Sequence, residues 1–135
     1  MKKLAKNLLK NLAILLIKIL SSFNSGRFFI DHLTKSIFSS KKKIFHNGTN
    51  LSFFTPNRLN FLRASTFSSK EPETLEWIDS FKKEKIFWDI GANIGLYSCY
   101  AAKKIGCKVY SFEPSVLNLE LLVKNIHHNS LSNKI

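Results

Sequence analysis

The stretch from Ile86 to Gly95 constrains the fold most, because an unbroken apolar run ends there beside an acid and is followed by a turn with two glycines. Residues 86–90 are predicted to form a strand buried on both faces of a parallel sheet, with Asp89 near its carboxyl end. Gly91 allows a tight turn that brings the backbone close to a ligand, and Gly95 allows the next helix to pack against the strand. The sequence therefore predicts a ligand-sized gap at this turn.

A helix and a second strand follow the turn. Residues 94–105 have helical spacing, and Gly106 is a suitable left-handed residue after the helix end. The next β-rich run, residues 108–112, delivers Glu113 about 20 residues after the turn, where nucleotide-binding βαβ units place an acid for ribose hydroxyls. The G-x-x-x-G spacing lacks the glycine that makes room for a pyrophosphate. A nucleoside ligand without a diphosphate is therefore predicted.

The motif of residues 89–95, together with Phe112–Ser115 and Asn118, resembles the FkbM family of S-adenosylmethionine-dependent methyltransferases. The resemblance extends upstream through residues 66–67 and 70–78, and downstream through residues 121–122 and 125–126 to Ile135. It implies an α/β fold, namely an incomplete Rossmann-like methyltransferase fold with a β-α-β-α order, and S-adenosylmethionine as the cofactor. The residues that it implies for cofactor binding are Asp89, Gly91, Ala92, Asn93, Gly95 and Glu113. For Asn93 two roles stay open, a contact with the donor or a cap on the helix that starts near Ile94.

The resemblance also implies methyl transfer to a sugar or another hydroxyl compound, with a small-molecule or glycan acceptor and no nucleic acid. No catalytic base is assignable, and the adenine contacts are expected beyond Ile135. The alternatives are a packing glycine turn without a ligand and a nicotinamide oxidoreductase, which the glycine spacing disfavours. Glu71 either points toward the donor pocket or is a solvated surface carboxylate.

Charge is distributed unevenly between the two halves of the chain. The net charge is +12, and all of this excess lies in residues 1–70, whereas residues 71–135 are neutral. We expect residues 1–70 to form a basic N-terminal region and residues 71–135 to form the N-terminal part of the S-adenosylmethionine-binding domain. A rival interpretation is a noncatalytic basic protein that binds a membrane surface or nucleic acid, although composition alone also accounts for such an excess.

Residues 1–20 are predicted to form a basic amphipathic helix, too short in its apolar run to span a membrane. This helix either docks on the rest of the protein or makes peripheral contact with an anionic membrane, so the chain is expected to be cytoplasmic with optional membrane association. The segments that follow are predicted as a helix over 28–38, a hairpin over 44–54 turning at Asn47-Gly48, an extended run over 61–67 and a helix over 73–81.

The C-terminal residues predict a second sheet-covering helix over 114–129, followed over 131–135 by a loop and the first residue of a third strand. Two strands leave a parallel sheet incomplete, so exposed apolar surface and an inactive 135-residue chain are expected. Cys99 and Cys107 lack the spacing of a metal site or a redox pair, and no metal is predicted.

Overall fold

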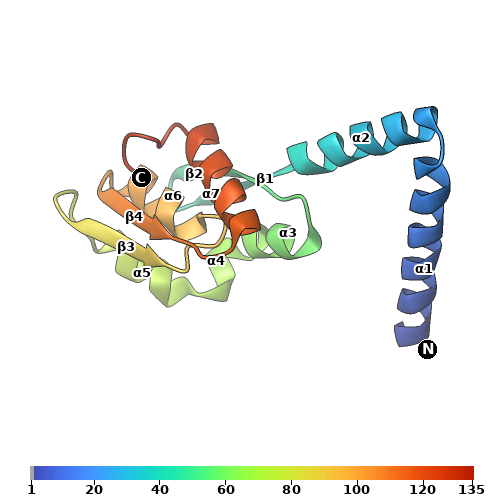
Figure 1. Cartoon of the computed structure of the whole chain (residues 1–135). Coiled ribbons are helices and arrows are strands. Elements are labelled where there is room, and N and C mark those ends of the chain that lie inside the picture. Colours follow the sequence, from blue (N-terminus) through green and yellow to red (C-terminus); the bar gives the residue numbers. More distant parts are fainter. Residues whose placement is uncertain (1) are drawn as a thin grey trace. The chain divides into compact units, whose positions relative to one another are not determined.

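The computed structural model describes residues 2–135, so Met1 of the predicted N-terminal helix lies outside the described residues. The chain divides into two compact units, one ending at Phe38 and one running from Ser39 to Ile135. The first unit contains α1 (Lys2–Ser21) and most of α2 (Asn24–Ser39) (Figure 1). Among residues 2–135, no helix is long and apolar enough to cross a membrane.

Gly26 determines how α1 and α2 meet. It is buried, and a Cβ atom at this position would lie 2.0 Å from the backbone oxygen of Leu20. Arg27 strengthens the bend, since its Nε donates a hydrogen bond of 2.7 Å to the backbone oxygen of Ser21. The predicted helix over 28–38 therefore exists, but it begins earlier, at Asn24.

The second unit opens with the predicted hairpin, formed by β1 (Lys41–His46) and β2 (Thr49–Phe54) in antiparallel pairing. Asn47 and Gly48 make the turn with φ values of 43° and 78°. Positive φ at both central residues is the geometry that Asn-Gly favours in a two-residue hairpin turn.

The prediction of an extended run over 61–67 is wrong. This part of the chain forms α3 (Arg58–Ser65) and α4 (Phe67–Lys70). Asn57 starts α3, because its side-chain oxygen accepts a hydrogen bond of 2.9 Å from the backbone N–H of Asn60. The aromatic and β-branched residues that favoured a strand are overruled by this cap and by helix packing against β1. The next helix, α5 (Pro72–Asp79), has its proline in the first turn.

The glycine turn lies within a β-α-β-α arrangement formed by β3 (Ile86–Ile90), α6 (Leu96–Lys104), β4 (Lys108–Phe112) and α7 (Val116–His128). The two strands are adjacent and parallel, with Phe87 opposite Val109, as predicted. The fold is α/β, with part of a Rossmann-like arrangement.

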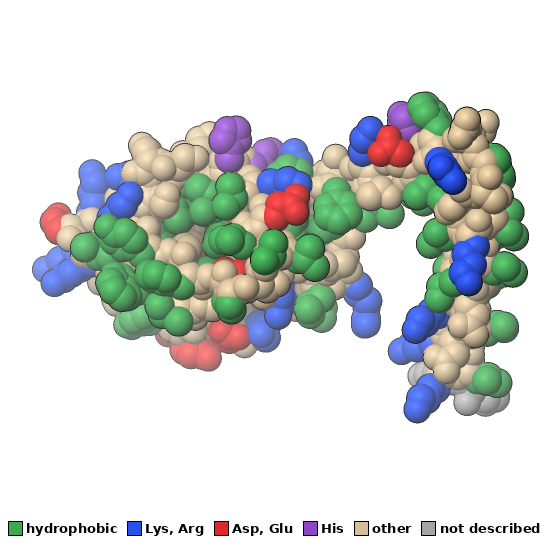
Figure 2. Space-filling model, in the orientation of Figure 1, with side chains coloured by type: hydrophobic (Ala, Val, Ile, Leu, Met, Phe, Trp, Pro, Cys, Tyr) green, Lys and Arg blue, Asp and Glu red, His purple; other side chains and the backbone are tan. Residues whose placement is uncertain are grey.

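Only one face of this sheet is covered, so the prediction of strands buried on both faces is wrong. Phe87 and Val109 point into the core against α6, whereas Trp88 is 62% exposed and Ile90 is 72% exposed on the opposite face. Figure 2 shows the hydrophobic side chains that gather on this part of the unit. Parallel strands normally have both faces covered by helices, and here the second layer is absent among the described residues.

The hairpin packs on the same core as the glycine turn, through α6 and α7. Two amides replace a neighbouring strand at the edge of β2, one from Asn125 on α7 and one from Asn129, which directly follows this helix. Asn125 accepts from the N–H of Phe54 at 2.8 Å, and Asn129 both accepts from and donates to the backbone of Ser52. Residues 39–70 are thereby grouped with residues 71–135, whereas the sequence grouped them with the N-terminal helix.

The loop predicted after α7 is a turn over residues 132–134, and Ile135, predicted to open a third strand, is not part of a strand in the structure. The backbone of the turn nevertheless contacts β4, since the N–H of Val109 donates to the oxygen of Lys134 at 2.8 Å.

Candidate functional site

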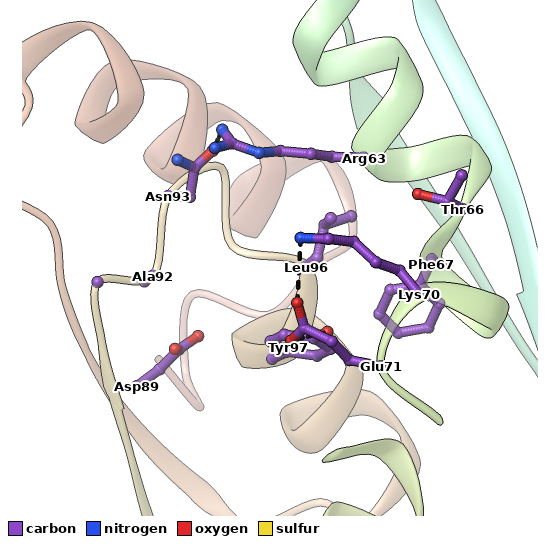
Figure 3. Close-up of a pocket in the computed structure, with 11 residues that line it drawn as sticks. Arg63, Thr66, Phe67, Lys70, Glu71, Asp89, Ala92, Asn93, Leu96 and Tyr97 are labelled. Atoms are coloured by element: carbon purple, nitrogen blue, oxygen red, sulfur yellow. Dashed lines mark hydrogen bonds and ion pairs between the residues drawn. The ribbon is translucent and has the colours of Figure 1, made fainter. Parts of the chain in front are cut away.

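A cavity of about 240 Å³ lies at the carboxyl end of β3, the position where open α/β sheets bind ligands. Figure 3 shows how the lining side chains surround it. One wall comes from β3 and the glycine turn, the opposite wall comes from α3, α4 and Glu71, and α6 adds Leu96 and Tyr97. The lining residues are Arg63, Thr66, Phe67, Lys70, Glu71, Asp89, Gly91, Ala92, Asn93, Leu96 and Tyr97.

The turn itself is a left-handed backbone that only some residues adopt. Gly91 has a φ of 84°, Asn93 of 53° and Gly95 of 85°. The N–H groups of Gly91 and Ala92 both donate to the backbone oxygen of Phe112, at 2.8 and 2.9 Å. These bonds join the ends of the two strands, so the turn is fixed relative to both.

The two glycines have different roles. A Cβ atom on Gly95 would lie 2.4 Å from Cδ1 of Leu122, so this glycine allows α7 to pack against the turn. A Cβ atom on Gly91 would meet nothing within 4 Å, and Gly91 lines the cavity. Gly95 therefore belongs to the packing behind the site, and Gly91 belongs to its surface.

Asp89 stands at the base of the cavity in a hydrogen-bonded chain. The Ser98 hydroxyl donates to its carboxylate at 2.5 Å, and the hydroxyls of Ser98 and Ser111 are 2.7 Å apart. Burial raises the pKa of Asp89 and outweighs the opposing effect of the Ser98 hydrogen bonds, and the nearby Glu113 carboxylate raises it further. Ser98, which is itself bonded to Ser111, holds this carboxylate in one orientation at the cavity.

Glu113 joins the second strand to the glycine turn. Its Oε2 accepts from the backbone N–H of Asn93 at 2.8 Å, and its Oε1 accepts from the N–H of Ser115 at 2.9 Å and from Nδ2 of Asn118 at 3.3 Å. Partial burial by itself raises the pKa of Glu113, but these hydrogen bonds hold the pKa below its usual value.

Arg63 and Lys70 bring two cations to the opposite wall, and the sequence motifs do not include Arg63. Nη1 of Arg63 donates to Oδ1 of Asn93 at 2.7 Å across the cavity, and Nζ of Lys70 lies 3.0 Å from Oε1 of Glu71 (Figure 3). The Tyr97 hydroxyl donates to Oε2 of Glu71 at 2.9 Å. Glu71 therefore lines the cavity, and the alternative of a carboxylate on an open surface is not what the structure shows.

The charges on this wall fix protonation states. The Lys70 ammonium, followed by the Tyr97 hydroxyl, lowers the pKa of Glu71, so this carboxylate is ionised at neutral pH. Burial, reinforced by Glu71, raises the pKa of Tyr97, so its hydroxyl stays protonated. Neither group is arranged as a general base, because Glu71 is already paired on both oxygens and the protonated Tyr97 hydroxyl has no proton-accepting form at neutral pH.

Four of the six predicted cofactor residues line the cavity, namely Asp89, Gly91, Ala92 and Asn93. Gly95 and Glu113 are not among the lining residues, and they hold the turn in place, Gly95 through packing against Leu122 and Glu113 through its bond to the N–H of Asn93. The Asn93 side chain takes neither predicted role alone: its oxygen accepts from the N–H of Ile94 at 3.0 Å as well as from Arg63, and α6 itself begins after Gly95.

Both cysteines are buried free thiols. Burial raises the pKa of Cys99 to about 12 and also raises the pKa of Cys107, so neither forms a thiolate at neutral pH. Across residues 2–135, no group of three His, Cys, Asp or Glu side chains is placed to hold a metal ion.

Comparison with known proteins relates the chain to methyltransferases. It is 32% identical over 78 residues to a tRNA (guanine(37)-N(1))-methyltransferase of Dictyostelium discoideum, a match that covers 58% of this chain and 17% of the relative. The crystal structure of a transferase from Pyrococcus horikoshii superposes with a TM-score of 0.50 at 21% identity, covering 70% of this chain and 34% of that one. The structural match supports the α/β fold alone. The chain spans about a sixth of the curated relative and about a third of the solved structure.

No protein-family model matches the chain. The similarity to a methyltransferase agrees with the relationship implied by the glycine turn, but it does not distinguish the FkbM family from other methyltransferases.

The expectation of a small-molecule or glycan acceptor with no nucleic acid is wrong. The curated relative is named for methylation of a guanine in tRNA. The physical reason for the error is that the glycine turn and the two acids concern the donor, and the residues quoted for the resemblance carry no information on the acceptor.

Proposed function

We propose that this chain is the donor-binding part of an S-adenosylmethionine-dependent methyltransferase that acts on RNA. One observation carries the proposal: a cavity at the carboxyl end of β3 combines a glycine turn, a half-buried acid and cations on the opposite wall. The similarity to a tRNA methyltransferase supports both the reaction and the RNA acceptor.

The amino-acid end of the donor matches the charges of the cavity. This end carries an ammonium and a carboxylate, which need an anionic and a cationic partner respectively. Asp89 supplies the first from β3, and Arg63 or Lys70 supplies the second from the facing helices (Figure 3). Arg63 is the better partner for a carboxylate, because guanidinium forms paired hydrogen bonds and Lys70 is already paired with Glu71.

The ribose is assigned to Glu113. A carboxylate has about four acceptor positions, and the hydrogen bonds from Asn93, Ser115 and Asn118 occupy three. One position on Oε2 stays open for one ribose hydroxyl. The second hydroxyl would replace Asn118, whose bond of 3.3 Å is the longest of the three.

The size of the cavity agrees with this partial assignment. Ligand pockets usually measure about 300 to 1,000 Å³, and a cavity of about 240 Å³ would hold the amino-acid end of the donor, with the ribose reaching past the turn to Glu113, which is not among the lining residues. The bound cofactor would supply a methyl group on a sulfonium. The residues described here bind and orient that group, and proton removal from the acceptor is not assigned to any of them.

Titration calorimetry tests the proposal. The 135-residue chain should bind S-adenosylmethionine or its demethylated product in preference to NAD, because the turn lacks the glycine that accommodates a pyrophosphate. A preference for NAD, or no binding of either methionine derivative by chain shown to be folded by circular dichroism, would overturn the proposal.

A further inference from the structure

The surface next to the donor cavity is built from cations and exposed apolar side chains of β1 and α3. Arg58, Phe61 and Leu62 occupy one face of α3, at the i, i+3, i+4 spacing that places side chains side by side. Asn60 and Ala64 face the core instead. Lys42 of β1 joins the same face, with its Nζ 5.4 Å from the centre of the Phe61 ring. We call Lys42, Arg58, Phe61 and Leu62 the α3 surface.

Charge in this region has a single sign. Residues 39–70 contain six Lys and Arg residues and no Asp or Glu. Within residues 2–135, no carboxylate lies at ion-pair distance from Lys42 or Arg58. The positive charge of the α3 surface is therefore available to an external anion.

Apolar side chains lie among these cations without cover. Phe61 is 51% exposed and Leu62 is 50% exposed. Lys42 lies over the Phe61 ring and restrains it, while half of the side chain stays accessible. Aromatic rings flanked by Lys and Arg are what single-stranded nucleic acids require, because bases stack on the rings and phosphates pair with the cations.

The position of this surface connects it to the donor. Arg63 directly follows Leu62 in α3, and its guanidinium reaches into the cavity to Asn93. We propose that the α3 surface binds the acceptor as single-stranded RNA, with phosphates on Lys42 and Arg58 and a base on Phe61, and so directs the acceptor toward the cavity. This inference rests on the proposed function for its choice of RNA as the acceptor.

Fluorescence anisotropy with a labelled single-stranded RNA tests the proposal on the full chain. Lys42→Gln and Arg58→Gln should each weaken binding and lower the slope of log Kd against log salt by about 0.7, the value for one phosphate contact on a single strand. Phe61→Leu, which keeps apolar bulk without a ring, should weaken binding about five-fold or more with the salt slope unchanged.

The control is Lys82→Gln, which removes a charge from the loop before β3, and it should bind RNA as the unsubstituted chain does. Equal affinity in all variants would overturn the proposal, and so would tight binding to vesicles of anionic lipid with no binding of RNA. Calorimetry of the unsubstituted chain with S-adenosylmethionine separates this proposal from the proposed methyltransferase function. If the α3 surface bound RNA but the chain did not bind S-adenosylmethionine, RNA binding by the α3 surface would stand and the methyltransferase function would be refuted.

Discussion

Oε2 of Glu113 accepts a hydrogen bond of 2.8 Å from the backbone N–H of Asn93, so the acid at the end of β4 is bonded to the glycine turn at the end of β3. Glu113 is therefore a structural part of the turn as well as the proposed ribose partner. An acid in this position is held in place before any ligand binds, and that arrangement lowers the ordering cost of binding.

Replacing Glu113 tests this double role. Glu113→Gln should cost about 1 to 3 kcal/mol of binding free energy for S-adenosylmethionine, because an amide has one acceptor oxygen where the carboxylate has two. Calorimetry measures the loss. Glu120→Gln is the matched control, since Glu120 is an exposed acid on α7 paired only with Lys124 among the described contacts. Unchanged affinity in Glu113→Gln would remove Glu113 from the donor site.

The raised pKa of Asp89 predicts that the stability of the fold depends on pH. Its folded-state pKa is raised above the unfolded value, so its contribution to stability is fully present below about pH 3.9 and is lost as the pH rises through the folded pKa. At pH 7 the folded protein must hold Asp89 in the ionised form that burial disfavours, and Asp89→Asn removes this penalty. The variant should therefore be more stable than the unsubstituted chain at pH 7, while binding S-adenosylmethionine less tightly.

Urea unfolding between pH 3 and pH 7, followed by circular dichroism, measures this effect. Glu113 acts in the opposite sense: its lowered pKa stabilises the fold above its unfolded value of about 4.3, and this contribution is lost as the pH falls through the folded pKa. Glu113→Gln should therefore lose stability at pH 7. If Asp89→Asn lost as much stability at pH 7 as Glu113→Gln, the ionised Asp89 carboxylate would stabilise the fold, against this prediction.

The two glycines of the turn should respond differently to alanine. Gly91→Ala meets no atom within 4 Å and costs only the strain of a positive φ, about 1 to 2 kcal/mol. Gly95→Ala has the same strain and also a contact of 2.4 Å with Leu122, which adds about 1 to 3 kcal/mol of overpacking. Thermal unfolding should rank the unsubstituted chain first and Gly95→Ala last. In a double-mutant cycle with Leu122→Ala, which is destabilising by itself because Leu122 is buried, Gly95→Ala should cost less than it does in the unsubstituted chain, and an equal cost in both backgrounds would contradict the packing role.

The elements near the glycine turn were predictable because their signals are local. The apolar run of β3, the two glycines and the spacing to Glu113 define a βαβ unit with parallel strands, and the structure contains one. The Asn47-Gly48 turn was predictable for the same reason, since two adjacent residues determine it.

The contacts that complete the site are distant in sequence, and local patterns do not reveal them. Arg63 meets Asn93 across 30 residues, and Asn125 links the N–H of Phe54 to the backbone oxygen of Ile94. The α7 pattern indicates an apolar face, but it does not show that buried amides on that helix satisfy the edge of β2. The Asn57 cap is an exception, because Asn before a helical segment is a local signal for a helix start and marks the beginning of α3.

Asn125 is therefore expected to stabilise the fold through the two hydrogen bonds of its side chain, although a polar residue on a packed helix face is not usually a core residue. Asn125→Leu leaves the N–H of Phe54 and the oxygen of Ile94 without their partners, and each buried unpaired group costs about 1 to 3 kcal/mol. Chemical unfolding should show a large loss relative to His127→Leu, an exposed position on the same helix. Comparable stability of the two variants would mean that α7 docks through its apolar residues alone.

The last prediction concerns how Arg63 recognises the donor. If its guanidinium binds the carboxylate of S-adenosylmethionine, Arg63→Ala should weaken binding of that ligand by about 1.5 to 3 kcal/mol, the range for hydrogen bonds to charged groups. Decarboxylated S-adenosylmethionine lacks the group, so the same substitution should leave its affinity almost unchanged. Calorimetry with both ligands on both chains gives the coupling between Arg63 and the carboxylate, and Lys82→Ala serves as the control for a loss of charge elsewhere. An equal loss for both ligands would assign Arg63 to holding Asn93 and the turn, at the bond of 2.7 Å that the structure already contains.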